Sequence, residues 1–210
     1  MIKRILSFAV AAALAGAAAA QGPAQTPDAA LKGTTEQIRG MIKEHYAEYR
    51  ADSGKFYKAV DDVVVPRFDM PYIAKLVLGA NYRTATPDQR SRFATAFKDM
   101  MVHAYASAML DNYNSAKITW EPTRMDPGGN DATVNSNLTK DSGQSYAIGF
   151  RVHLVDGDWK VYDLVVENVS LVFNFRTQLN AEIRKSGLDD VIARMVKGEF
   201  IHDADQQHGK

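Results

Sequence analysis

The sequence predicts an α+β fold in which helices pack on a curved four-stranded antiparallel sheet. Apolar residues recur at helical spacing up to about residue 113 and then alternate with polar residues between residues 118 and 167. Helical spacing returns after Ser170. No internal repeat or linker interrupts this order, so residues 28–200 are expected to form one domain, followed by a polar tail over residues 201–210.

Composition excludes several classes of protein. The 210 residues carry 25 Lys and Arg against 25 Asp and Glu, and this zero net charge argues against a basic nucleic-acid-binding protein. The absence of cysteine excludes disulfides, thiolate zinc sites and cysteine nucleophiles. Five histidines are scattered without a close pair, so the sequence predicts neither a metal site nor a cofactor.

Residues 1–20 are typical of a cleaved secretory signal peptide. Two basic residues precede an apolar run over residues 5–15, and Ala18-Ala19-Ala20 offers the small side chains that signal peptidase requires. The alternative is a membrane anchor, but the run is shorter than the roughly 18 to 20 residues that cross a bilayer. Cleavage after Ala20 would leave a net charge of −2 and a polar leader over residues 21–27. Export without cysteine favours a bacterial periplasm.

Three helices are expected before residue 80. Asp28 is expected to cap a helix that ends near Arg50. A third, short helix is expected to begin after Asp69 and to end at Gly79. Between them lies a helix that stops at Pro66 and carries Phe56, Val60, Val63 and Val64 on one side.

The strongest local pattern is the capping box Thr86-Pro87-Asp88-Gln89, which has proline at the first helical position. The helix that follows is expected to reach Tyr113 and to bury a wide apolar stripe, in which only the last residue is polar. The stripe comprises Phe93, Phe97, Met100, Ala104, Ala108 and Asp111.

The four strands are expected where apolar and polar residues alternate. They lie over residues 118–120, 134–138, 146–154 and 159–167, and Asp156-Gly157 is a hairpin turn before the last strand. Helices from Leu171 to Lys185 and from Leu188 to Lys197, separated by Gly187, complete the prediction.

Catalytic motifs are missing from the sequence. It has no glycine-rich phosphate loop, no G-x-S-x-G elbow and no H-E-x-x-H. Asp163 is the one acid inside an apolar run, and a buried carboxylate on a curved sheet could act as a general base. The alternative is that Asp163 accepts hydrogen bonds from a neighbouring loop or helix terminus. We favour this structural role, because no partner histidine or second acid is evident.

Methionine and aromatic residues are abundant, with 8 Met, 9 Phe and 9 Tyr in the chain. They concentrate on the long helix after Thr86 and on the strand around Phe150. Methionine fills irregular space, which suits both a packed core and a pocket for a flexible apolar ligand. Periodicity cannot separate these two possibilities, and composition alone favours a core.

Several short stretches of the sequence resemble the MlaC family and occur in the order expected of it. Members of this family are the toluene-tolerance, phospholipid-binding proteins of the bacterial periplasm. The runs are Val60-Asp61, Val65-Pro66, Leu76-Val77-Leu78-Gly79, Tyr82-Arg83, Ala85-Thr86-Pro87, Gln89-Arg90, Phe93, Phe97, Tyr105-Ala106, Trp159-Lys160-Val161-Tyr162-Asp163 and Glu167-Asn168-Val169-Ser170. One departure is Asn168, where the family usually carries glycine. Asparagine is the residue other than glycine that best tolerates a positive φ, so the turn is expected to survive.

The resemblance implies a nuclear-transport-factor-two-like cone whose helices and sheet enclose an apolar pocket for phospholipid. It implies a monomeric periplasmic carrier that performs no chemistry. Such carriers shuttle lipid between an outer-membrane lipoprotein–porin complex and an inner-membrane ABC transporter with an MCE-domain subunit, and so maintain outer-membrane lipid asymmetry. Phospholipid is then cargo rather than a cofactor.

Three groups of side chains are expected to line this pocket. The long helix contributes Phe93, Phe97, Met100, Met101 and Tyr105, and the sheet contributes Val134, Leu138, Ile148, Phe150 and Val152. The mouth is formed by Val77, Leu78, Val169, Leu171 and Phe173.

Three other functions stay open at this point. The first is a carrier of another apolar lipid, such as a hopanoid. The second is a cone-fold enzyme that uses Asp163 with Tyr162 or Tyr146. The third is an adaptor whose apolar face binds protein in an exposed groove.

Overall fold

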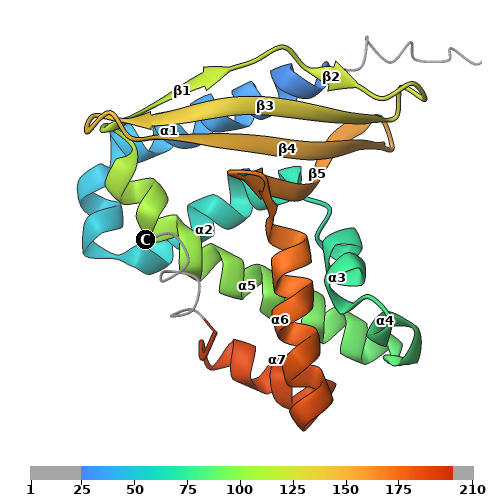
Figure 1. The fold of residues 1–210 in the computed structure, drawn as a ribbon. Helices are drawn as coiled ribbons and strands as arrows, with labels where there is room; N and C mark the ends of the chain where they lie inside the picture. The colour runs from blue at the N-terminus through green and yellow to red at the C-terminus, as the bar shows by residue number, and fades with distance from the viewer. Residues whose placement is uncertain (1–24, 201–210) are drawn as a thin grey trace, which may run out of the picture.

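The computed structural model describes residues 25–200 (Figure 1). The predicted signal peptide, residues 21–24 of the leader and the polar tail lie outside the described residues. Helices α1 to α5 come first, the six strands follow, and α6 and α7 end the described chain. No helix within residues 25–200 is long and apolar enough to cross a membrane.

Helix α1 (Pro27–Ala51) begins earlier than predicted. Thr26 is the N-cap instead of Asp28, and its hydroxyl accepts a hydrogen bond from the backbone N–H of Ala29 at 3.4 Å. Proline at the first helical position has no N–H to satisfy, so the cap falls on the residue before it. Asp28 lies in the first turn of the helix.

The signals around α3 are confirmed. Asp69 caps this helix by accepting a hydrogen bond from the N–H of Tyr72 at 3.0 Å, and Gly79 ends it with a φ of 55°. Two short elements were not predicted, because they have too few residues to show a period. The elements of this region are α2 (Ser53–Val63), the 3-10 helix η1 (Val65–Arg67), α3 (Met70–Leu78) and α4 (Asn81–Thr84).

Helix α5 (Pro87–Asn112) starts at the predicted capping box, in which the Thr86 and Gln89 side chains each accept a hydrogen bond from the other residue's backbone N–H. The predicted stripe is wrong in the second half of the helix, where Ala108 and Asp111 are exposed. This half buries Val102, Ala106 and Leu110 instead, because α1 and α2 pack against that side.

The sheet has six strands, so the prediction of four is corrected. The four predicted strands are present, and two strands of two residues each pair with them. The strands are β1 (Ala116–Trp120), β2 (Arg124–Met125), β3 (Asp131–Lys140), β4 (Ser145–Val155), β5 (Asp158–Val166) and β6 (Val169–Ser170). All pairings are antiparallel in the order β1-β3-β4-β5-β6, with β2 also paired to β3. Two residues are too few to produce an alternating pattern.

Residues with positive φ make two tight turns in the sheet. Asp156 and Gly157, with φ values of 50° and 84°, form the predicted hairpin turn between β4 and β5. Glu167 and Asn168, at 49° and 66°, turn the chain from β5 into β6. Asn168 therefore adopts the positive φ that was expected of it.

Three buried apolar clusters hold the elements together. The helical cluster joins α3 and α5 to α6 (Leu171–Ser186) and α7 (Leu188–Val196), which extend away from the sheet in Figure 1. The α1–α2 cluster joins those two helices to the second half of α5. The sheet cluster joins the start of α1 to β3, β4 and β5. It comprises Ala30, Leu31, Ala132, Val134, Val152, Trp159 and Val161.

Replacing Gly79 with alanine should destabilise the fold by about 1–3 kcal/mol. The residue has a positive φ, and a Cβ there would lie 2.8 Å from Nε of Arg176. Urea denaturation measures the loss. The matched control is Gly33→Ala in the middle of α1, where a Cβ meets nothing within 4 Å. This control should stabilise the protein by about 0.5–1 kcal/mol. Equal effects of the two substitutions would contradict the prediction.

Candidate functional site

Most of the helix-borne residues predicted to line the pocket lie in the helical cluster. Val77, Leu78, Phe93, Phe97, Met100 and Leu171 are buried there, and Met101 packs against the cluster while half-buried. Phe93 and Phe97 stack with ring centroids 6.0 Å apart, and Phe97 meets Phe175 edge to face at 5.4 Å. Many of the residues predicted to line a pocket are therefore packed against one another.

The predicted sheet residues share one face, as the alternation indicated. The pairing places Val134 and Leu164 opposite Phe150, and Ser136 opposite Ile148. Val134 and Val152 are fully buried in the sheet cluster. Phe150 packs against that cluster and against the ring of Trp120, at a centroid distance of 5.8 Å. Leu138 and Ile148, further along the same face, are only half-buried.

The structure places the helical and sheet residues in two separate clusters. Helix α5 packs mainly against α2, α3 and α7, whereas the sheet is approached most closely by α1, α3, α6 and η1. Among the described residues, Phe68 and Leu164 are the two that pack against both clusters. We call this place, where the helical and sheet clusters meet at Phe68 and Leu164, the seam. Neither residue was among the predicted lining residues, although Leu164 lies within the alternating pattern of its strand.

The remaining three predicted lining residues are not buried. Val169 on β6 is 53% exposed and Phe173 on α6 is 68% exposed, so both face the surface near the start of α6. Tyr105 on α5 is half-buried.

Asp163 has the structural role that we favoured from the sequence. Its side chain is 4% exposed and accepts hydrogen bonds at the start of α6, from the N–H of Val172 at 3.1 Å and the hydroxyl of Ser170 at 2.7 Å. Arg151 donates a third bond at 2.9 Å. The Ser170 hydroxyl in turn caps α6 by accepting from Phe173 at 3.0 Å. These three donors engage both carboxylate oxygens, as a helix-capping role requires.

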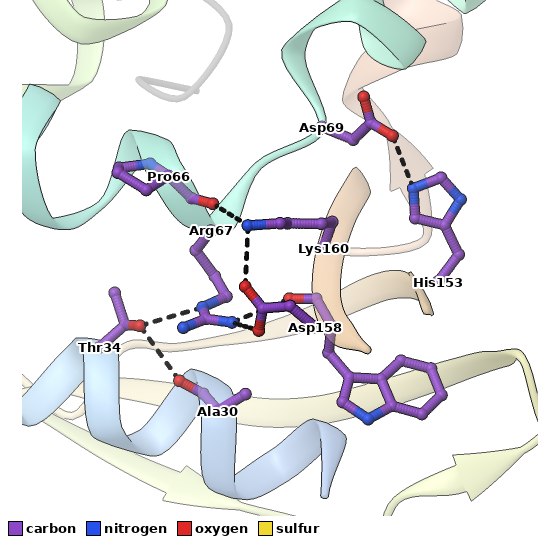
Figure 2. A network of polar contacts seen from close by, with 9 residues as sticks. Ala30, Thr34, Pro66, Arg67, Asp69, His153, Asp158 and Lys160 are labelled. Carbon is purple, nitrogen blue, oxygen red and sulfur yellow. Dashed lines mark hydrogen bonds and ion pairs between the residues drawn. The ribbon is translucent and has the colours of Figure 1, made fainter. Parts of the chain in front are cut away.

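A polar network joins the segment before α3 to the sheet and to α1 (Figure 2). Arg67 donates to the Asp158 carboxylate at 2.6 Å, to the carbonyl of Trp159 at 3.0 Å and to the hydroxyl of Thr34 at 3.3 Å. Lys160 bridges the same carboxylate and the carbonyl of Pro66, each at 2.8 Å. The network fixes the entry to α3 relative to β5.

The charge of Asp158 contributes to this attachment. Burial alone would raise the pKa of its carboxyl, but hydrogen bonds from Lys160 and Arg67 outweigh burial and hold that pKa below its ordinary value. The contribution to stability is therefore present above the unfolded-state pKa of about 3.9 and is lost as pH falls through the lower folded-state pKa.

A second polar contact fixes the start of α3. His153 on β4 and the cap residue Asp69 lie 3.0 Å apart, Nε2 to Oδ2 (Figure 2). Tyr72 and Tyr162 surround the imidazole, with ring centroids 4.9 and 5.1 Å away. Burial raises the pKa of Tyr162. Within residues 25–200, no group of three or more His, Cys, Asp or Glu side chains could hold a metal ion.

These features define an α+β protein in which a helical cluster and the apolar face of a sheet meet at the seam, and in which the polar residues described above fix the fold. Comparison with known proteins agrees with this class. The model of the MlaC protein family matches residues 32–197, and the chain belongs to this family.

Two curated relatives and one solved structure are similar over most of the chain. Toluene tolerance protein Ttg2D of Pseudomonas putida is 31% identical over 167 residues, which cover 79% of this chain and 77% of the relative. The intermembrane phospholipid transport system binding protein MlaC of Haemophilus influenzae is 25% identical over 173 residues, covering 81% and 80%. A phospholipid-binding protein from Ralstonia solanacearum, solved in complex with a phospholipid, superposes with a TM-score of 0.72 at 25% identity and covers 89% of this chain and 99% of its own.

Replacing Asp163 with asparagine should lower the free energy of unfolding by about 1–3 kcal/mol, because a buried charged acceptor of three hydrogen bonds is lost. Ser170→Ala removes one of the same bonds. The two effects measured by urea denaturation should therefore be less than additive in the double variant. Unchanged stability of Asp163→Asn would contradict the capping role. The folded variant should still bind lipid, whereas an enzyme that uses this carboxylate as a base would lose turnover.

Proposed function

We propose that this chain is a phospholipid carrier that holds acyl chains between the helical cluster and the sheet. The observation that carries the proposal is the seam, where two apolar surfaces lie close together and few side chains bridge them. Half-buried apolar residues continue both surfaces away from the seam, with Met101 on the helical side and Ile148 and Phe150 on the sheet side. Family membership and the solved phospholipid complex of a relative support the same cargo.

The thermodynamics of lipid transfer suits such a site. Two acyl chains contain roughly 30 methylenes, and burying them from water would release about 24 kcal/mol at about 0.8 kcal/mol each. This value exceeds the ceiling of about 18–21 kcal/mol for non-covalent affinity. The relevant process is therefore transfer of the lipid from one apolar environment, the membrane, to another, the protein. The free-energy change of this transfer can be close to zero. Such a transfer allows a carrier to release its cargo as well as to take it up.

The carrier performs no chemistry on its cargo in this proposal. The one acid inside the apolar run, Asp163, has both carboxylate oxygens engaged in capping α6. Headgroup recognition by an ionic site is not required, since the acyl chains supply the affinity.

The proposed place of action is the bacterial periplasm. The signal peptide predicted over residues 1–20 and the absence of cysteine support it. The transport system named for the Haemophilus influenzae relative supports exchange with membrane complexes. We propose that these are the outer-membrane lipoprotein–porin complex and the inner-membrane MCE-domain ABC transporter that the family resemblance implies, and that the carrier acts as a monomer.

Replacing Phe150 with aspartate should abolish co-purification of lipid, because a charge would then lie on the apolar surface that the acyl chains contact. Lipid extracted from the purified protein is identified by mass spectrometry, which separates phospholipid from a hopanoid. The matched control is Val196→Asp, at a position on α7 that is 73% exposed, and its lipid load should be unchanged.

A second variant separates loss of the site from loss of the fold. Ile148→Trp fills space on the same face without adding a charge, and thermal melting reports whether each variant is folded. A normal lipid load in folded Phe150→Asp protein would refute the assignment of this face. An empty wild-type protein that also fails to take up phospholipid would refute the carrier function.

A further inference from the structure

A groove of about 570 Å³ lies between α3 and the first half of α5, at the edge of the helical cluster, to which its lining residue Ala74 belongs. It shares no residue with the predicted cargo lining. Its apolar part is formed by Val65, Met70, Pro71, Ala74 and Ala94. From Arg90 to Lys98 the groove follows α5 for about 12 Å, at 1.5 Å per residue. Its volume lies within the range of about 300–1,000 Å³ that is usual for small-molecule sites.

The two ends of the groove differ in polarity. One end of the groove is lined by Lys98 and by three apolar residues. These are Met70 and Pro71, at the start of α3, and Val65 of η1. The other end has Tyr82, Arg90 and Ser91, which supply a phenol, a guanidinium and a hydroxyl. A ligand that matches the groove therefore has an apolar chain and a polar head.

Positive charge is available only at the Arg90 end. Lys98 at the other end is already held by Asp61 at 3.0 Å and Asp99 at 2.7 Å. Arg90 donates its Nε–H to the carbonyl of Tyr82 at 2.9 Å and lies over the ring of that tyrosine, 4.3 Å from the centroid. No carboxylate within residues 25–200 forms an ion pair with Arg90. Its position is thus fixed while its charge is not neutralised.

We propose that this groove binds the alkyl chain of an anionic amphiphile, with a carboxylate or phosphate at Arg90 and Ser91. The planar guanidinium matches both anions, and its preformed orientation reduces the entropy lost on binding. The chain lies along Ala94 and Ala74 toward Met70. This site is separate from the cargo site, and its existence does not depend on the proposed function.

The test follows the methyl groups of methionine by NMR during titration with dodecanoate. Met70 lines the groove and packs on the edge of the helical cluster, so its signal reports on the groove, whereas Met100 is buried inside that cluster and does not line the groove. We expect a saturable shift of the Met70 signal, and about tenfold weaker binding to Arg90→Gln, the loss expected for one charge-assisted hydrogen bond. Arg90→Lys, which retains the charge, should lose less.

Two further variants make the test specific. Ala94→Trp fills the groove and should abolish the Met70 shift while leaving the co-purified lipid in place. Arg92→Gln is the matched control, because Arg92 is on the same helix but pairs with Asp88 and Asp189. It should bind dodecanoate as the wild type does. Thermal melting checks that each variant is folded.

The choice of amphiphile identifies the head group. Dodecyltrimethylammonium should bind more weakly than dodecanoate, because its charge is reversed. Tighter binding of dodecanoate than of lauroyl-lysophosphatidylglycerol would support a free fatty acid as the source, and the reverse order would support a phosphate-bearing lipid. The proposal is overturned if Met70 does not shift, if only Met100 shifts, or if folded Arg90→Gln or the cationic amphiphile binds as tightly as the reference. None of these results bears on the phospholipid load, which is measured on the same samples.

Discussion

Strand β5 is the main element through which α3 and α6 are attached to the sheet. On one side, Phe68 pairs with Val161, and the N–H of Asp69 donates to the carbonyl of Val161 at 2.9 Å, so the chain enters α3 from the strand itself. Further along the strand, Asp163 caps α6, which follows β5 after the turn at Glu167 and Asn168 and the two residues of β6. Helices α3 and α6 thus hold the helical cluster in place without requiring α5 to pack on the sheet. Only the half-buried apolar residues beside the seam, such as Met101 of α5 and Ile148 and Phe150 of the sheet, are then left for another occupant, which we propose is lipid.

In this arrangement polar and apolar residues have different roles. Buried or half-buried polar groups such as Asp163, Asp69 and Arg67 fix backbone segments relative to one another, and each is engaged by specific donors or acceptors. The apolar residues on either side of the seam make no such directional contacts, so they can accommodate chains of different length. A carrier that must release its cargo benefits from this separation, because the polar contacts that hold the fold together need not change when the cargo leaves.

Features of the fold that depend on a few neighbouring residues could be predicted from the sequence. The capping box at Thr86, the cap at Asp69 and the turn at Asp156-Gly157 follow from local hydrogen bonding and positive φ. The cap of α1 was missed although Thr26-Pro27-Asp28 repeats the pattern Thr86-Pro87-Asp88. Strands β2 and β6 could not be predicted, because a strand of two residues is defined by its partner. The exposure of Ala108 could not be predicted either, because it depends on which side of α5 the helices α1 and α2 occupy.

For the candidate site, the sequence indicated which faces are apolar but not what each face contacts. The alternation around Phe150 correctly placed Val134, Ile148 and Val152 on one side of the sheet. Phe97 packs against Phe175, whereas Val152 packs with α1. These contacts depend on how the helices and the sheet assemble, which the spacing of apolar residues alone does not reveal. The role of Asp163 was inferred from the absence of a catalytic partner, whereas its three donors come from β4 and from the start of α6. Phe68 was missed because it lies in a short connection with no periodic pattern.

The location of the cargo is tested most directly by photo-crosslinking with a phosphatidylglycerol that carries a diazirine near the end of one acyl chain. The lipid is loaded into the purified protein and irradiated, and the modified peptides are mapped by mass spectrometry. We expect adducts on peptides that contain Met101, Phe150 and Leu164, on both sides of the seam. Adducts confined to the groove beside Arg90 or to the exposed surface of α7, in protein that retains the lipid, would contradict this expectation.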